Sequence, residues 1–158
     1  MSNERNKLLD VTLDEASLAP ASANAEHERR IALFDLKEAN SFEVGGEDRG
    51  PYLLALSLNE GRLALDVSSE QGERVCLHHV AMSSLRKLIK DYTLICDSYH
   101  NAIRTASPSQ IEAIDMGRRG LHNEAAEVLS EALGDKIKVD IETARRLFTL
   151  VCALHVRG

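Results

Sequence analysis

Two adjacent arginines between two glycines are the residues best suited to chemistry. Arg118 and Arg119 lie between Gly117 and Gly120, just before a run with helical periodicity. Glycine lets a backbone approach a ligand closely, and a guanidinium group can bind phosphate or carboxylate through two hydrogen bonds. The amino end of a helix also favours an anion. The pattern therefore predicts a site for a small anionic or phosphorylated ligand.

Three polar residues that follow the arginines would extend this site. His122 could transfer a proton, and Asn123 and Glu124 could supply polar contacts. The alternative interpretation is a joint between helices, in which the arginines pair with Asp115, Glu112 and Glu124. The run contains neither GxGxxG nor GxxxxGK[ST], so it matches no named phosphate-binding loop. The sequence leaves both interpretations open.

A second polar group lies on a segment that is expected to form a long helix. Asp97, His100 and Arg104 are three and four residues apart, so they can share one helical face. Asp91 and Ser98 lie on the same segment. This face could line a cleft, and exposure to solvent explains the pattern equally well.

The histidines and cysteines form no recognisable metal site. Cys76 and His78 would share one face of a strand, whereas His79 would point to the other face. Two donors alone are a weak indication of a metal site, because zinc sites in proteins use three or four protein ligands. No Ser/His/Asp or Cys/His triad can be assembled from the sequence. We therefore expect no metal and no cofactor, and we favour a binding or regulatory module over an enzyme.

The composition is typical of a globular protein in a reducing compartment. Of the 158 residues, 44% are hydrophobic and 28% are charged, close to the average for folded domains. Cys76, Cys96 and Cys152 lie in apolar patterns and include no Cys-x-x-Cys pair, as suits free thiols. No segment resembles a secretory signal, and none is long enough to cross a bilayer. We expect a cytoplasmic protein without a membrane partner.

The distribution of charge argues against a nucleic-acid partner. The net charge is −6, and residues 1–70 carry 7 basic against 14 acidic side chains. Residues 71–158 carry 12 basic against 11 acidic side chains. Nucleic-acid binding needs a basic surface, and binding through base stacking also needs exposed aromatic rings. Aromatic residues make up 4% of the chain and Trp is absent, so we expect no nucleic acid to bind.

The first half of the chain is predicted to contain one helix and several strands. Apolar runs at 52–58, 62–67 and 74–80 are separated by compact turns with glycine, which is typical of an antiparallel meander. Residues 8–13 would add a strand at the edge, and residues 26–39 carry a partial helical stripe. Two segments without periodicity separate these elements, a linker at 14–25 and a loop at 45–51.

The second half shows helical periodicity from Ser84 onward. Apolar residues recur at intervals of three and four from Leu85 to Ile103, which predicts one long helix with Ser83 or Ser84 as its N-cap. Ser107, Pro108 and Gln110 form a capping box with proline at the first helical position. They predict a short helix that Gly117 ends or bends.

Three further elements complete the prediction. A helix at 121–133 would end at Gly134, and alternation at 136–139 indicates a short strand. Asp140 is a suitable N-cap for a last helix at 141–155, which is apolar nearly all round and therefore expected in the core. The prediction is a single α+β domain over residues 1–158. A three- or four-stranded antiparallel meander sheet would pack against the mainly helical residues 84–158, and a homo-oligomer is possible.

Several long runs in the sequence resemble a known family. These runs are residues 90–92, 95–99, 102–120, 140, 143–152 and 154–155, together with Glu28 and Phe34-Asp35 near the front. They are similar to UPF0262, a family of uncharacterised bacterial proteins found mostly in alphaproteobacteria. Val156 departs from the pattern, since many members have an aromatic residue there. The resemblance covers nearly the whole chain and implies a bacterial cytosolic protein of one domain, but it brings no activity and no catalytic residues.

Overall fold

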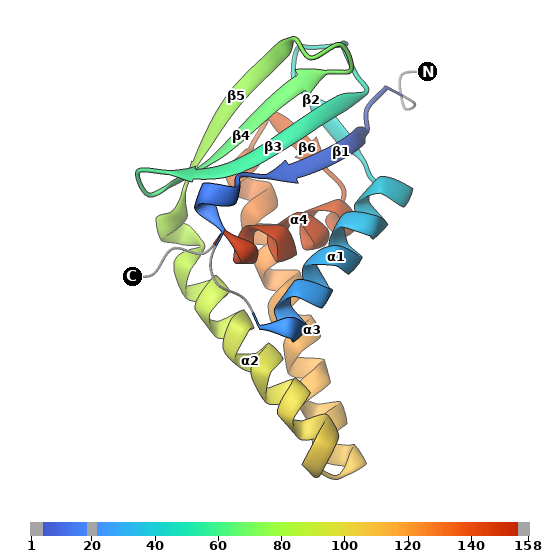
Figure 1. Ribbon diagram of the computed structural model, residues 1–158, viewed down its shortest axis with the longest axis vertical. Coiled ribbons are helices and arrows are strands. Elements are labelled where there is room, and N and C mark those ends of the chain that lie inside the picture. The colour runs from blue at the N-terminus through green and yellow to red at the C-terminus, as the bar shows by residue number, and fades with distance from the viewer. Residues whose placement is uncertain (1–4, 19–21, 155–158) are drawn as a thin grey trace.

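A sheet at one end of the molecule and a long helical hairpin extending away from it define the architecture (Figure 1). The structure is a computed structural model that describes residues 5–18 and 22–154. The predicted α+β class is confirmed, with four helices, a four-stranded sheet and a separate two-stranded sheet in the described residues. No helix in these two ranges is both long and apolar enough to cross a membrane.

The larger sheet has the strand order β1-β3-β4-β5. Its strands are β1 (Leu8–Leu13), β3 (Tyr52–Asn59), β4 (Arg62–Ser69) and β5 (Arg74–Ala81). The last three form the predicted antiparallel meander, whereas β1 pairs in parallel with β3 at the edge. The prediction of a wholly antiparallel sheet is therefore wrong at β1, which is parallel to its neighbour. The chain crosses over through a helix between β1 and β3, and such a crossover brings two strands into the same direction.

A two-stranded antiparallel sheet joins the two halves of the chain. It consists of β2 (Phe42–Val44) and β6 (Ile137–Val139). The sequence predicts β6 but not β2, because three residues are too few to show a clear alternation. Beside this pair the Gly45 amide donates to the Lys136 carbonyl at 2.8 Å. A Cβ atom at Gly45 would lie 2.5 Å from the Asp135 carbonyl oxygen, so the close approach of the two backbones requires glycine.

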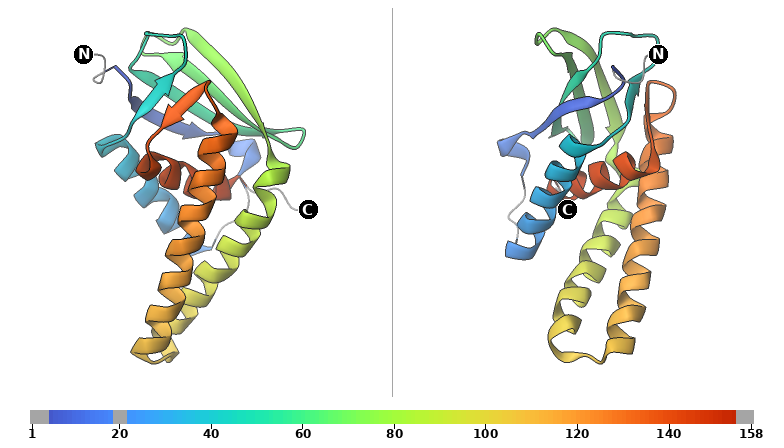
Figure 2. Two further views of the ribbon diagram at one scale, coloured as in Figure 1. Left: turned by 180° about the vertical axis from the view of Figure 1, so that it is seen from behind. Right: turned by 90° about the vertical axis from the view of Figure 1, so that its right-hand side faces the viewer.

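Four helices cover one face of the larger sheet and extend away from it. They are α1 (Ala23–Glu38), α2 (Arg86–Thr105), α3 (Pro108–Leu133) and α4 (Ile141–Ala153), and two short 3-10 helices are η2 (Glu15–Ser17) and η3 (Met82–Ser84). Figure 2 shows α2 and α3 side by side as a long antiparallel hairpin. Helix α4 lies between the sheet and the other helices and packs against α1 and α3.

Helix α3 is continuous where a break was predicted. Gly117 and Gly120 both lie inside it, and Gly134 ends it as expected, with φ +62°. A Cβ atom at Gly117 would lie 3.0 Å from the Cδ1 atom of Ile95 on α2. A glycine inside a helix costs about 1 kcal/mol relative to alanine. At Gly117 the glycine allows the two helices of the hairpin to pack closely, and this packing maintains the helix.

The capping signals have mixed outcomes. The capping box at Ser107 is confirmed, since Ser107 Oγ accepts from the Gln110 amide at 3.3 Å and Gln110 Oε1 accepts from the Ser107 amide at 3.1 Å. Asp140 is also confirmed, because its Oδ1 accepts from the Thr143 amide at 2.8 Å. The prediction of Ser83 or Ser84 as the cap of α2 is wrong. Both lie in η3, and α2 begins after Leu85 without a side-chain cap.

Some helix boundaries and one inward-facing residue differ from the prediction. Helix α1 begins at Ala23, inside the predicted linker, because Ser22 Oγ accepts a hydrogen bond from the Ala25 amide at 3.1 Å. Helix α4 ends at Ala153, and the predicted last residue, His155, lies outside the described residues, as does Val156. Ile103 was assigned to the inner face of α2, yet its side chain is 50% exposed. It lies in the last turn of α2, near the end of the hairpin that is remote from the core.

Helix α4 is central to the core, as its apolar sequence predicts. Leu147, Phe148, Leu150 and Val151 are all buried. They belong to one hydrophobic cluster with the inner face of the sheet and with the inner sides of α1, α2 and α3. The same helix places Arg145, Thr149 and Cys152 toward the other helices, where the candidate site lies.

Candidate functional site

The two adjacent arginines share one carboxylate. Arg118 Nη2 lies 2.6 Å from Asp115 Oδ1, and Arg119 Nε lies 3.1 Å from Asp115 Oδ2. The Arg118 hydrogen bond, with the charges of both arginines, holds the pKa of the Asp115 carboxyl below its usual value. The Arg118 guanidinium also lies over the Tyr99 ring of α2, 4.4 Å from its centroid, in a cation–π contact. The contact with Tyr99 ties α3 to α2, whereas the contacts with Asp115 are within α3.

Of the three carboxylates considered for the joint between helices, Asp115 is the partner of both arginines, and it lies on α3 with them. The Arg118 side chain is 22% exposed and the Arg119 side chain 67% exposed. Neither arginine lines the two cavities described below. An anion site at this pair stays a prediction.

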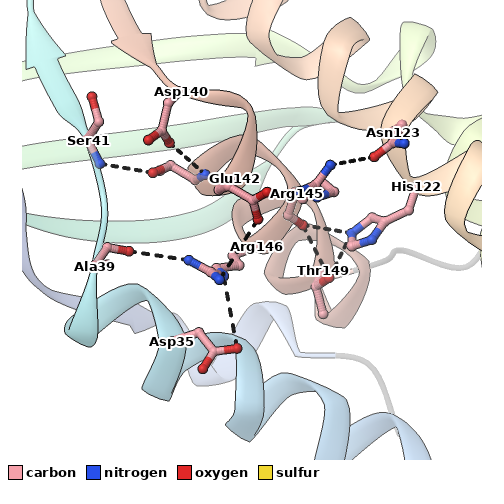
Figure 3. Close-up of polar contacts among 11 residues, drawn as sticks. Asp35, Ala39, Ser41, His122, Asn123, Asp140, Glu142, Arg145, Arg146 and Thr149 are labelled. Carbon is pink, nitrogen blue, oxygen red and sulfur yellow. Dashed lines mark hydrogen bonds and ion pairs between the residues drawn. The ribbon is translucent and has the colours of Figure 1, made fainter.

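The three polar residues after the arginines point to different places. His122 turns toward α4, where its Nε2 lies 2.8 Å from the Arg145 carbonyl oxygen and 3.2 Å from Thr149 Oγ1 (Figure 3). Asn123 Oδ1 accepts a hydrogen bond from Arg145 Nη1 at 2.6 Å. Glu124 is exposed. The structure therefore joins His122 and Asn123 to α4, and it does not bring them to Arg118.

The environment of His122 favours the neutral form of its imidazole. Burial lowers the pKa of its imidazole below the ordinary value, and the nearby charge of Arg145 acts in the same direction. Its ring stacks on Tyr92 with centroids 4.8 Å apart and lies 6.1 Å from the Phe148 ring. The Arg145 carbonyl can only accept a hydrogen bond, so we assign the proton of the neutral ring to Nε2. His122 thus links α2, α3 and α4.

The stability of the fold should fall as the pH drops from 7.5 to 5.5. The unfolded chain takes up a proton on His122 near pH 6.5, whereas the folded chain resists protonation because burial lowers that pKa. The free energy of unfolding then decreases by up to about 1.4 kcal/mol per pH unit for one such group. Burial lowers the pKa of His78 as well, which adds to the effect.

Urea denaturation of His122→Gln at the two pH values checks this assignment. The variant should lose a smaller part of its unfolding free energy between pH 7.5 and 5.5 than the wild type loses. His27→Gln is the matched control, because His27 is exposed on α1, and it should follow the wild type. An unchanged pH dependence in His122→Gln would contradict the assignment of a neutral, buried His122.

A cavity of about 300 Å³ lies between α1, α2 and α4. It brings together residues that are far apart in the sequence. The residues that line it are Ser22, Asn24, Ala25, Glu28 and Arg29 from the start of α1, Tyr92, Thr93, Cys96, Asp97 and His100 from α2, and Thr149, Cys152 and Ala153 from α4. Two members of the second polar group, Asp97 and His100, are among them, whereas Arg104 is exposed and is not.

Two free thiols belong to the wall of this cavity. Burial raises the pKa of both Cys96 and Cys152, so both thiols are protonated at neutral pH. Burial also raises the pKa of the Tyr92 hydroxyl beside them. The thiolate is the reactive form of cysteine. Among the described residues no hydrogen bond joins either thiol to a histidine or a carboxylate.

A smaller cavity of about 170 Å³ adjoins the first. The two share Glu28 and Thr149 as lining residues. Around the smaller one, Arg146 lies 4.0 Å from Asp35 Oδ2 and 3.9 Å from Glu142 Oε1 (Figure 3). Arg145 pairs with Glu142 as well. Asp35 and Glu142 at the smaller cavity therefore each have an arginine partner.

Cys76 and His78 lie on the same strand, β5. In the part of the chain that the structure describes, no group of three or more His, Cys, Asp or Glu residues is arranged to hold a metal ion. Burial raises the pKa of Cys76 and lowers that of His78. Both groups are therefore neutral, as expected for side chains on the inner face of a strand.

Sequence reasoning missed the α1 and α4 walls of the larger cavity. Glu28, Thr149 and Cys152 come from helices that are separated by most of the chain, and only the packing of α1 on α4 brings them together. Cys96 and Cys152 were assigned to apolar stripes, which is correct for their helices. Their shared position at one cavity has no local signal in the sequence.

Comparison with known proteins identifies the family. Residues 5–157 match the model of the uncharacterised protein family UPF0262. A UPF0262 protein of Azorhizobium caulinodans is 59% identical over 97% of this chain and 96% of its own length. Those of Methylobacterium radiotolerans and Brucella canis are 56% and 54% identical, over 97% and 96% of this chain and 95% of each relative. No solved structure matches. The chain therefore belongs to the UPF0262 family.

Proposed function

We propose that this protein binds a small molecule and has no catalysis of its own. The ligand would occupy the cavity between α1, α2 and α4. The proposal is carried by one observation, a cavity of about 300 Å³ whose wall is shared by three helices. Small-molecule sites are typically concave, of this size or larger, and lined by apolar side chains with a few polar groups that orient the ligand.

The chemistry of the lining supports this proposal. Tyr92, Cys96, Cys152 and Ala153 provide the apolar part of the wall. The wall also includes polar side chains at Glu28, Arg29, Asp97 and His100. An apolar wall with a few charged groups suits a ligand that has an apolar body and a polar head.

The protonated thiols favour binding over catalysis. A cysteine nucleophile needs a lowered pKa or an adjacent base. Cys96 and Cys152 have a raised pKa, and no base is hydrogen-bonded to either within the described residues. His122 is held in hydrogen bonds to Arg145 and Thr149, which fits a structural role.

A thermal-shift screen against amines, carboxylic acids, nucleotides and sugar phosphates tests the proposed function. A ligand present far above its dissociation constant raises the melting temperature of the protein. Ala25→Phe should abolish the shift, because Ala25 lines the cavity and a larger side chain there would obstruct it. Ala23→Phe is the matched control, since Ala23 is also exposed in the first turn of α1 but does not line the cavity.

Two results would overturn the proposed function. One is a screen in which no compound raises the melting temperature of the wild type. The other is a set of active compounds that shift Ala25→Phe as strongly as they shift Ala23→Phe. A phosphorylated compound whose shift disappears in Arg119→Ala would instead support the predicted anion site on α3. A homo-oligomer also stays a prediction, and light scattering on the purified protein measures it.

A further inference from the structure

We propose that the cavity between α1, α2 and α4 selects an organic cation, a small molecule with an ammonium group on an apolar body. This inference rests on the proposed function and specifies its ligand class. Such a ligand has the opposite charge to the anion that the arginine pair on α3 would bind. The argument uses the charges at the cavity wall, their internal partners and the position of Glu28.

Carboxylates outnumber permanent cations at the cavity wall. Glu28 and Asp97 are acidic, whereas Arg29 is the one arginine in the lining, which contains no lysine. The lining also contains His100, together with the protonated groups of Tyr92, Cys96 and Cys152. The arginines packed behind this region do not line the larger cavity, and each has a carboxylate contact within its own helix: Arg118 with Asp115, and Arg145 with Glu142. The lining itself therefore carries two carboxylates against one arginine.

Glu28 has little internal compensation. Among the described residues its one ion-pair contact is with His100, whose Nε2 lies 4.0 Å from Glu28 Oε2, and no hydrogen bond reaches its carboxylate there. The neighbouring cavity offers a direct comparison, because Asp35 and Glu142 are each paired with an arginine. Glu28 therefore differs from these two carboxylates in having a histidine rather than an arginine as its ion-pair partner within the described residues.

Glu28 is also in the right place to bind the head of a ligand. It lines both cavities, and the side chains across the larger cavity are those of Tyr92, Cys96 and Cys152. A ligand whose apolar body contacts Tyr92 and the two thiols would place its head near the α1 wall. A hydrogen bond between an ammonium group and a carboxylate is about twice as strong as a bond between neutral groups. Glu28 is therefore the residue that would discriminate between head groups. The negative charge of Asp97 would add to the attraction for a cation.

Three probes with one apolar body test the ligand class. They are 2-phenylethylamine, 2-phenylethanol and 3-phenylpropionate, and isothermal titration calorimetry gives their dissociation constants. On the wild type, the amine should bind more tightly than the alcohol, and the alcohol more tightly than the acid. Glu28→Gln should raise the dissociation constant of the amine by about tenfold, because the charged pair is lost. The dissociation constant of the alcohol should be nearly unchanged.

Glu26→Gln is the control for charge alone. Glu26 is exposed on the same helix and does not line the cavity, so this variant should retain the wild-type preference. Circular dichroism establishes that each variant is folded before titration. Asp97→Asn should produce a smaller loss of amine affinity than Glu28→Gln, since Asp97 is the more exposed of the two.

Each remaining outcome overturns a defined part of the inference. Preference for the acid on the wild type would overturn the cationic class while leaving a functional cavity. An amine preference that persists in Glu28→Gln would overturn the role of Glu28. No binding of any probe would overturn the inference, and the broader screen with Ala25→Phe then decides the proposed function independently.

Discussion

Replacing Phe148 with alanine should lower the free energy of unfolding by about 3–5 kcal/mol, the usual cost of removing a buried ring. Phe148 is 0% exposed on α4. Its ring centroid lies 5.7 Å from that of Tyr92 in an edge-on contact and 6.1 Å from that of His122. Truncation therefore removes the contacts that hold α4 against α2 and α3, and it leaves a cavity that rigid neighbours cannot fill.

Phe34→Ala is a matched control for this loss. Phe34 lies on α1 with its side chain 64% exposed, so the same truncation should change the unfolding free energy by no more than about 0.5 kcal/mol. Urea denaturation followed by circular dichroism measures both variants. Equal losses in the two variants would contradict the central position of α4. Because α4 also forms one wall of the larger cavity, Phe148→Ala should weaken any ligand bound there.

Local signals in the sequence were sufficient for most helices and strands. The capping box at Ser107 and the cap at Asp140 depend on residues within one turn, and both are observed. The meander follows from alternation along each strand, and the central position of α4 follows from its apolar surface. Such features are fixed by neighbours in the sequence, so they can be predicted without the fold.

The errors concern features that distant residues decide. Helix α3 continues through Gly117 because Ile95 of α2 packs against that position. Strand β2 exists because β6, from the other half of the chain, pairs with it. Strand β1 runs parallel to β3 because a crossover through α1 connects them. None of these partners is visible from the local pattern.

In the candidate site too, the sequence predicted contacts within one helix but not contacts between distant helices. Spacing of three and four residues correctly suggested that Arg118 and Arg119 could pair with Asp115, since all three lie on one helix. Spacing also placed Asp97 and His100 on a face that could line a cleft, and both line the larger cavity. Glu28, which supplies the opposite wall, belongs to another helix. Its relation to Asp97 depends on tertiary packing alone.

Asn40→Asp should destabilise the fold by about 3 kcal/mol, although the two side chains have nearly the same shape. Asn40 Oδ1 accepts from the Leu8 amide at 2.7 Å, while its Nδ2 donates to the Leu8 carbonyl at 2.9 Å and the Leu36 carbonyl at 2.6 Å. One side chain thus closes the end of α1 and pairs with the first residue of β1. Loss of a donor in a partly buried site costs about 1–3 kcal/mol, and more where the new group is charged.

The size of the destabilisation depends on pH, which separates it from a general loss of packing. Aspartate keeps the acceptor for the Leu8 amide but turns a charged oxygen toward two carbonyl oxygens, which raises the pKa of the introduced carboxyl. Below that pKa the protonated carboxyl can donate one hydrogen bond, so the destabilisation should be smaller at pH 4.5 than at pH 7.5. Asn59→Asp, at an exposed strand end, should cost no more than about 0.5 kcal/mol at either pH. A loss in Asn40→Asp that does not change with pH would show that packing, rather than the two donated hydrogen bonds, makes Asn40 necessary.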